Sequence, residues 1–125
     1  MEKKIKIQIG TFEGVGELNA TKIAERIWEV LPIQASFEFW GDEIYFPVPI
    51  KEKKLENPVN VVQIGDLGYW PGGHCFCIFY GPTPISSPGE IRPASSVEII
   101  GRFLGDPQGL KKISGERKIV LEKIS

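Results

Sequence analysis

The sequence predicts a mainly β protein, a small closed or nearly closed barrel of about eight strands with one long α-helix laid across it. Short apolar runs that alternate with period two recur along the chain, and glycine and proline turn signals separate them. Only the stretch at about residues 20–31 has the apolar spacing of a helix. The 125 residues are expected to form a single domain, 1–125, which is large enough to bury a core without disulfides or metals.

The N-terminal part supplies two expected strands and the helix. Residues 4–9 alternate lysine or glutamine with isoleucine, which is typical of a half-buried strand, and residues 12–18 can return beside it. In the helix that follows, apolar side chains recur at three- and four-residue spacing. Either Asn19 or Thr21 is a competent N-cap, and Pro32 is expected to end the helix.

The middle of the chain predicts a hairpin that is interrupted by prolines. Residues 33–40 and 43–50 are separated by a Gly-Asp turn and favour a hairpin or a sheet corner. Pro47 and Pro49 each remove a backbone donor, so the second strand is expected at a sheet edge or a bulge. The charged residues 51–58 are expected to form a solvated loop.

The most unusual stretch, residues 64–84, predicts a β-hairpin with an aromatic-rich surface. Its two aromatic and apolar runs are separated by Pro-Gly-Gly, and the second run ends at a Gly-Pro pair. A short strand at 61–64 precedes it, and the loop at 83–96, rich in proline, serine and glycine, is expected to form the rim of a site. The remaining expected elements are a strand, a helical turn and a last strand, at residues 97–104, 109–113 and 116–124.

Charge and composition narrow the classes of partner. The formal net charge of −1 gives no attraction to nucleic acid. No leader-like segment and no run of about 20 apolar residues occurs, so a cytoplasmic protein without membrane association is expected. Cys75 and Cys77 are the only cysteines, which fits a reducing compartment. Frequent isoleucine, lysine and glutamate with little asparagine favour a thermophilic source.

Several short segments, in order and spread over nearly the whole chain, carry a family resemblance. They are Gly-Asp-Glu-Ile-Tyr-Phe at 41–46, Glu-Asn-Pro at 56–58, Gly-Asp-Leu-Gly-Tyr-Trp-Pro at 65–71, Phe-Tyr-Gly-Pro-Thr-Pro at 79–84, and Arg-Pro-Ala-Ser-Ser at 92–96 with Ile-Gly at 100–101. The chain thus resembles the prokaryotic cyclophilin-like family, whose function is unknown. The resemblance implies a cyclophilin-like closed barrel of about eight strands, smaller and with fewer helices than the standard cyclophilins.

Standard cyclophilins are peptidyl-prolyl cis-trans isomerases, which lower a barrier of about 18–20 kcal/mol. They hold the proline ring in an apolar pocket while an arginine reaches the prolyl nitrogen. Their Phe-His-Arg-Val strand and Gln-Gly-Gly-Asp turn are absent here, and no arginine lies in a matching motif: the arginines are Arg26, Arg92, Arg102 and Arg117. No catalytic residue is carried over, so isomerase activity is implied by fold analogy alone.

The aromatic residues of the two hairpins favour a binding function instead. They provide more aromatic area than a small barrel core needs, so some are expected to line a cleft for an extended peptide or a flat small molecule. Because alternate residues of any strand face the core, about half of them are expected to pack inside. The candidate ligand-binding residues are Tyr45, Phe46, Tyr69, Trp70, His74, Phe76, Phe79, Thr83 and Pro84.

Strand periodicity divides the second run of the aromatic hairpin into two faces, either of which can be the inward one. The faces hold Cys75, Cys77 and Phe79 on one side and His74, Phe76, Ile78 and Tyr80 on the other. His74 and Cys75 therefore point to opposite faces and cannot form a nucleophile pair. His74 is expected at the surface or at a strand end. The cysteines are expected to be small buried hydrophobes, because structural zinc needs four ligands.

The carboxylates give no clear catalytic pattern. Asp42 and Asp66 fit turn positions, and Glu43 directly precedes the aromatic strand. The sequence neither supports nor excludes a catalytic acid/base pair among them. No phosphate or dinucleotide motif occurs, so no cofactor and no metal is expected.

The function that the sequence favours is that of an uncharacterised cyclophilin-like protein that binds a peptide or small ligand in an aromatic cleft. The alternative is an atypical peptidyl-prolyl isomerase. A structural subunit of a homo-oligomer is a third class, which applies if the aromatics prove to be core residues and a partner chain covers the edge strand near Pro47.

Overall fold

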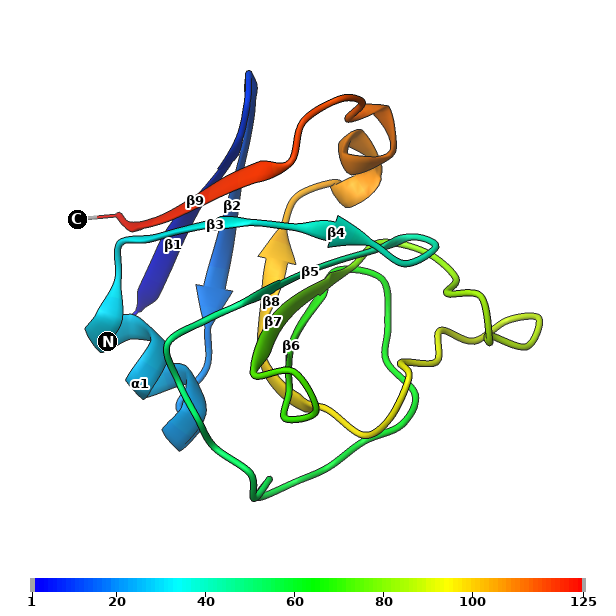
Figure 1. The fold of residues 1–125 in the computed structure, drawn as a ribbon, viewed down its shortest axis with the longest axis horizontal. Helices are drawn as coiled ribbons and strands as arrows, with labels where there is room; N and C mark the ends of the chain where they lie inside the picture. The colour runs from blue at the N-terminus through cyan, green and yellow to red at the C-terminus, as the bar shows by residue number, and fades with distance from the viewer. Residues whose placement is uncertain (1, 125) are drawn as a thin grey trace.

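The computed structural model describes residues 2–124, and within them it contains nine strands, one α-helix and one 3-10 helix (Figure 1). Their bounds, in chain order, are β1 (Lys3–Ile9), β2 (Phe12–Leu18), α1 (Lys22–Val30), β3 (Ile33–Ser36), β4 (Glu38–Phe39), β5 (Glu43–Pro47), β6 (Asp66–Trp70), β7 (Cys75–Phe79), β8 (Glu98–Leu104), η1 (Pro107–Lys112) and β9 (Lys118–Lys123). The strands form one antiparallel sheet in the order β3-β9-β1-β2-β8-β6-β7-β5-β4.

The two ends of the sheet are joined directly by the polypeptide chain. Its two end strands, β3 and β4, are consecutive in sequence and are separated only by Phe37, whose backbone N–H donates to the Arg117 carbonyl oxygen over 2.8 Å. β3 also lies next to β5 (Figure 1). The prediction of a mainly β, nearly closed barrel is therefore confirmed. The expected run at residues 33–40 forms two short strands that belong to opposite ends of the sheet.

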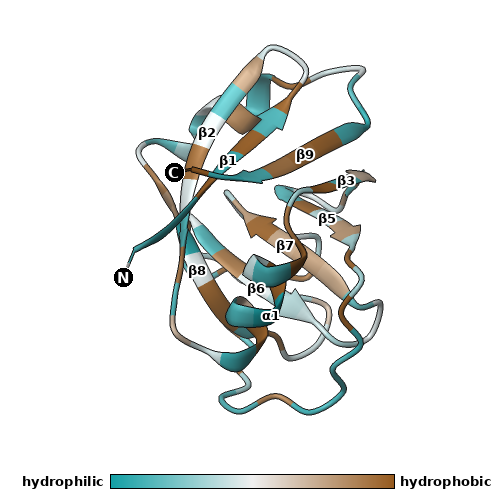
Figure 2. Ribbon diagram, turned by 90° about the vertical axis from the view of Figure 1, so that its left-hand side faces the viewer, coloured by the Kyte–Doolittle hydropathy of each residue, from teal (hydrophilic) through white to brown (hydrophobic). Residues whose placement is uncertain are grey.

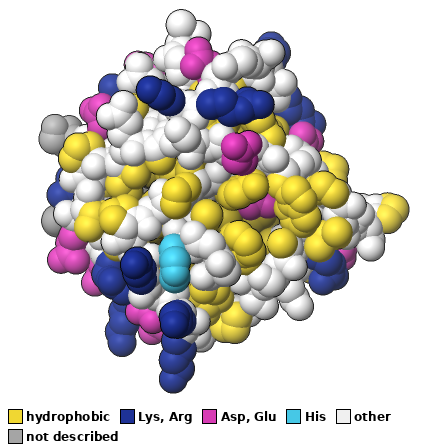
Figure 3. Space-filling view, in the orientation of Figure 1, with side chains coloured by type: hydrophobic (Ala, Val, Ile, Leu, Met, Phe, Trp, Pro, Cys, Tyr) yellow, Lys and Arg dark blue, Asp and Glu magenta, His cyan; other side chains and the backbone are white. Residues whose placement is uncertain are grey.

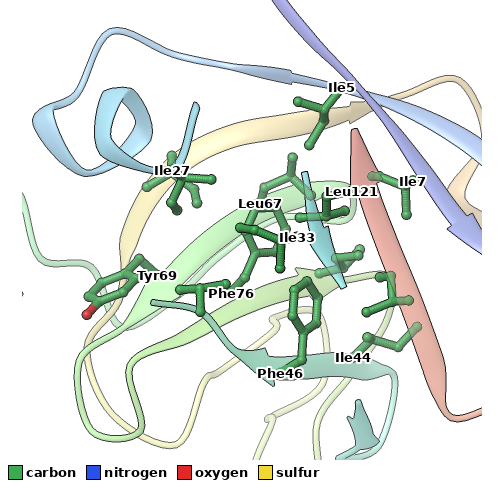
Figure 4. Close-up of a cluster of buried hydrophobic side chains, with 14 of the residues drawn as sticks. Ile5, Ile7, Ile27, Ile33, Ile44, Phe46, Leu67, Tyr69, Phe76 and Leu121 are labelled. Atoms are coloured by element: carbon green, nitrogen blue, oxygen red, sulfur yellow. The ribbon is translucent and has the colours of Figure 1, made fainter. Parts of the chain in front are cut away.

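The inward faces of the strands and of the helix form the main core. Ile5, Ile7 and Ile9 of β1 are buried, as the period-two alternation predicts. Figure 4 shows aliphatic and aromatic side chains from strands on both sides of the barrel meeting in this interior. The rings of Phe46 and Phe76 stack there with their centroids 5.2 Å apart.

The helix is shorter than the expected span of about 20–31. Thr21 is its N-cap, with its hydroxyl accepting from the backbone N–H of Ala24 over 3.2 Å, and Leu31 is its extended C-cap. Asn19 instead donates its side-chain amide to the Ile99 carbonyl oxygen over 2.8 Å, which ties the chain to β8. The buried face of α1 packs near β2 and β8, and its hydrophilic side faces outward (Figure 2).

Two long loops connect the strands, and the first of them includes residues that the sequence suggested as strand. β5 ends at Pro47 instead of residue 50, since the prolines cannot donate to a sheet ladder. The strand expected at 61–64 is absent, and Val62 forms only an isolated bridge with Ile91. Residues 48–65 and 80–97 therefore connect the strands as irregular chain. The expected helical turn is the 3-10 helix η1, and the last strand is β9.

None of the helices within residues 2–124 is long and apolar enough to cross a membrane.

Candidate ligand-binding pocket

The outer face of the strands β5 and β7 carries a second, smaller cluster of side chains. In β5, Ile44 and Phe46 point into the barrel, so Glu43 and Tyr45 point outward. The register pairs Glu43 with Phe79 and Tyr45 with Cys77. The long loops cover this outer face, and the cluster beneath them consists of Val62, Cys75, Cys77, Phe79, Ile91 and Val97. The face that the sequence left unassigned is therefore settled: Phe76 and Ile78 point inward, and the cysteines and Phe79 point outward.

A pocket of about 220 Å³ opens at the edge of this cluster. Its lining comes from four separate segments: the β4–β5 turn, β5, the end of β6 and the loop before β8. The lining residues are Trp40, Glu43, Tyr45, Trp70, Pro93, Ala94 and Val97. Figure 3 shows hydrophobic side chains gathered over β5 and the loop that follows β7, with acidic side chains among them.

Local backbone contacts hold the walls of the pocket in place. The N–H of Trp40 donates to the Glu43 carbonyl oxygen over 2.9 Å and closes the β4–β5 turn. Gly41 in that turn has φ 61° and lies against the Pro82 carbonyl oxygen, so a side chain there is excluded. On the opposite wall, the indole Nε1–H of Trp70 donates to the Ser95 hydroxyl over 2.6 Å. The loop before β8 and the end of β6 are thereby joined.

Glu43 is the carboxylic acid of the pocket lining, and the residue is 6% exposed. Burial raises the pKa of its carboxyl from 4.5 to about 7, and a hydrogen bond from the Cys77 thiol lowers it by a smaller amount. Both protonation states are therefore populated near neutral pH. Burial holds the pKa of Cys77 well above its usual range, so this residue stays a neutral thiol donor. Within residues 2–124, no ion pair includes Glu43.

Of the candidate residues predicted from the sequence, the structure brings Tyr45 and Trp70 into this pocket. Phe46, Phe76 and Tyr69 belong to the barrel core. Phe79 lies buried in the outer cluster.

Tyr69 and His74 meet at a different place. The Tyr69 hydroxyl donates to the Ile50 carbonyl oxygen over 2.9 Å and accepts from the backbone N–H of Glu52 over 3.0 Å. Nδ1 of His74 lies 3.3 Å from the Tyr69 hydroxyl oxygen. His74 lies in the β6–β7 turn with φ 54°, the left-handed region. These contacts fasten the start of the 48–65 loop to the hairpin, which is a structural role.

Thr83 and Pro84 lie in the loop that follows β7, outside the pocket lining. Thr83 is buried, with its hydroxyl donating to the Arg92 carbonyl oxygen and its N–H donating to the Ser86 hydroxyl over 2.9 Å. Pro84 is exposed. Beside them is an open groove of about 810 Å³ between residues 61–64 and 82–91.

Five lining residues were not among the named candidate ligand-binding residues: Trp40, Glu43, Pro93, Ala94 and Val97, although Pro93 and Ala94 belong to the loop at 83–96 that was expected to form the rim of a site. One signal was available for Glu43, because it alternates with Tyr45 on the same strand and must share its face. The other residues come from turns and loops, whose approach to the strands leaves no periodic pattern. Within residues 2–124, no three potential metal-ligating side chains gather into a group.

The comparisons with known proteins agree with this architecture. The sequence profile of the cyclophilin-like family matches residues 3–122, so the chain belongs to the cyclophilin-like family. The solution structure of the hypothetical protein AF2241 from Archaeoglobus fulgidus is similar, with a TM-score of 0.82 and 38% sequence identity. That similarity covers 98% of this chain and 95% of the other. No curated protein matches the chain.

Proposed function

We propose that this cyclophilin-like protein is a binding module whose pocket receives a small molecule or one side chain of a peptide. The observation that carries the proposal is an aromatic pocket, walled by Trp40, Tyr45 and Trp70, with a buried carboxyl group at its side. Ligand sites in proteins combine apolar and aromatic walls with a few placed polar groups in this way.

The size of the pocket limits what it encloses. Its volume of about 220 Å³ is below the range of about 300–1,000 Å³ that is usual for drug-sized ligands. One compact head group or one side chain fills it. A larger ligand extends over the surrounding loops.

The isomerase alternative is supported by the fold alone. None of the residues that line the pocket is an arginine, and the standard cyclophilin mechanism needs one at the prolyl nitrogen. The same titration nevertheless tests both functions when X-Pro peptides are included.

The experiment is an NMR titration of labelled protein with a panel of small fragments and X-Pro peptides. The chain has three tryptophans: Trp40 and Trp70 line the pocket, whereas Trp28 lies on α1. We expect the indole signals of Trp40 and Trp70 to shift on binding while that of Trp28 stays in place. Truncation Trp70→Ala should weaken binding at least tenfold, because it removes a whole wall. Trp28→Ala is the matched control and should leave the affinity unchanged.

Three results would overturn the proposal. Shifts confined to residues 61–64 and 82–91 would move the site to the open groove, and no shift with any probe would remove these ligand classes. Cis-trans exchange of a bound X-Pro peptide above background, lost in Trp70→Ala, would replace a binding role with isomerase activity.

A further inference from the structure

The pocket combines a buried acidic group with aromatic rings over which no lysine or arginine of residues 2–124 lies. We propose that its ligand is a compact organic cation, an alkylated ammonium group, held by the Glu43 carboxylate against the faces of Trp40, Tyr45 and Trp70. This inference rests on the proposed binding function and specifies the chemical class of the ligand.

The first argument concerns charge. A buried carboxylate is costly unless an opposite charge accompanies it. Within residues 2–124, the Cys77 thiol donates to the Glu43 carboxyl, and no lysine or arginine forms an ion pair with it. The nearest acidic neighbour in sequence, Asp42, is already paired with Lys111 at 3.8 Å. A cationic ligand supplies the charge that the protein itself does not place beside Glu43.

The second argument concerns the rings. A cation over the face of a tryptophan or tyrosine is attracted by the ring quadrupole, and aromatic cages bind quaternary ammonium groups in this way. Elsewhere in residues 2–124 the protein places its own cations over rings: Arg117 lies 5.2 Å from the Phe39 centroid, and Lys123 lies 5.0 Å from the Trp28 centroid. Neither of those rings lines the pocket. Among the described residues, no lysine or arginine lies over the three rings of the pocket.

The third argument distinguishes an alkylated ammonium from a primary one. A primary ammonium group has three donors that need acceptors. Apart from Glu43 and the Tyr45 hydroxyl, the side chains that line the pocket are apolar or, in the tryptophans, donate through an indole N–H. A head group covered by methyl groups needs few acceptors and fills this volume with apolar contact.

Binding of a cation must be coupled to the protonation of Glu43. The titratable groups that face it are the thiols of Cys75 and Cys77 on β7 and the hydroxyl of Tyr45 on its own strand, all of which stay neutral near pH 7. Glu38 on β4 lies across from Tyr45 and is exposed, and the covering loop contributes Pro93, Ala94 and Val97, which do not titrate. Only Glu43 therefore changes charge in the pocket near neutral pH, where its pKa is about 7.

The experiment compares choline with its uncharged isostere 3,3-dimethyl-1-butanol, by calorimetry and by the tryptophan indole signals. At pH 8 we expect choline to bind at least tenfold more tightly than the isostere. Below pH 7 the affinity for choline should fall by about tenfold per pH unit, because the carboxylate must first lose its proton. Affinity for the isostere should not fall.

The variant Glu43→Gln keeps the shape of the side chain and removes its charge. It should lose the preference for choline and the pH dependence while still binding the isostere. Glu38→Gln is the matched control, since it removes an exposed carboxylate on the neighbouring strand, and it should behave as the unmodified protein does.

The possible outcomes distinguish failure of the cation proposal from failure of the proposed binding function. Equal affinity for choline and the isostere, or unchanged choline binding in Glu43→Gln, would overturn the cation proposal and leave the pocket as a binding site. Binding of neither probe, with no shift of the Trp40 or Trp70 signals, would overturn the cation proposal, and a wider panel without any shift would remove the binding function as well.

Discussion

At the scale of single residues, Glu43 departs from what packing alone requires. It occupies an outward position of a strand, and the loops then cover it beside Cys77 and the aromatic walls. Burial raises the pKa of its carboxyl from 4.5 to about 7. A group whose pKa is higher in the folded than in the unfolded protein stabilises the fold only while it is protonated.

This gives a pH-dependent prediction for stability. The contribution of Glu43 is fully present below about pH 4.5 and is lost as the pH rises to about 7, so it amounts to about 3 kcal/mol over that window. Urea unfolding of the unmodified protein and of Glu43→Gln, measured from pH 4 to pH 8, should show the unmodified protein losing that amount relative to the variant. Glu38→Gln should follow the unmodified protein. A relative gain in stability with rising pH would contradict the assignment.

Tyr69 gives a second prediction at this scale. Its hydroxyl satisfies both the Ile50 carbonyl and the Glu52 N–H at the start of the long loop. Tyr69→Phe leaves both groups without this partner, so we expect a loss of about 1–3 kcal/mol in the free energy of unfolding, measured with urea at pH 7. Tyr45→Phe is the control, with an expected change within about 0.5 kcal/mol, because its side chain is half-buried at the pocket. Equal losses in both variants would show that the Tyr69 hydroxyl has no special role.

At the scale of the elements, alternation in the strands was predictable and the choice of face was not. The sequence divided β7 correctly into two faces, and its own residues are apolar on both. The assignment of Phe76 to the interior and of Cys77 to the outer cluster depends on the loops that cover the second face. When a strand is buried on both faces, both faces are apolar, so its sequence does not indicate which face points into the barrel.

The pairing of β2 with β8 yields a prediction about packing. A Cβ at Gly101 would overlap the carbonyl oxygen of Glu17, which belongs to the backbone of β2 and cannot move away alone. Gly101→Ala should therefore cost about 2–4 kcal/mol in unfolding free energy or prevent folding.

Gly16→Ala is the matched control for this packing prediction. Its new Cβ would lie 3.1 Å from the end of the Leu67 side chain, which can adjust. We expect it to cost about 1 kcal/mol. Similar stability of the two variants, measured by thermal unfolding, would mean that the strands separate more easily than their geometry suggests.

At the scale of the whole molecule, the barrel has a well-paired side and a loop-covered side. Every strand except β3 and β4 has a hydrogen-bonded neighbour on both sides, whereas β3 and β4 lie at the ends of the sheet and β4 has only two residues. We predict that amide hydrogen exchange is slowest in the strands that are paired on both sides and fastest in residues 48–65 and 80–97. Loops that exchange as slowly as the central strands would show that the cover over the pocket unfolds only with the barrel.

Two further expectations concern the molecule as a whole and stay predictions. Homo-oligomer formation is tested directly by light scattering. The thermophilic source suggested by the composition is tested by a thermal midpoint above about 65 °C, the upper end of the range typical of mesophilic domains.

By itself, the sequence determined the mainly β class, the alternating isoleucines of β1, the position of the helix and the family. Each of these depends on local periodicity, on a cap or on a motif, and such signals act over a few residues. Only the tertiary structure decided that Phe37 joins the two ends of the sheet and that Glu43 lies among Trp40, Tyr45 and Trp70. Trp40, Glu43 and Tyr45 belong to one hairpin, whereas Trp70 and the covering residues 93–97 come from distant parts of the chain, and the covering loop has no periodicity that would place it there. The raised pKa of Glu43 follows from that burial, which no single segment encodes.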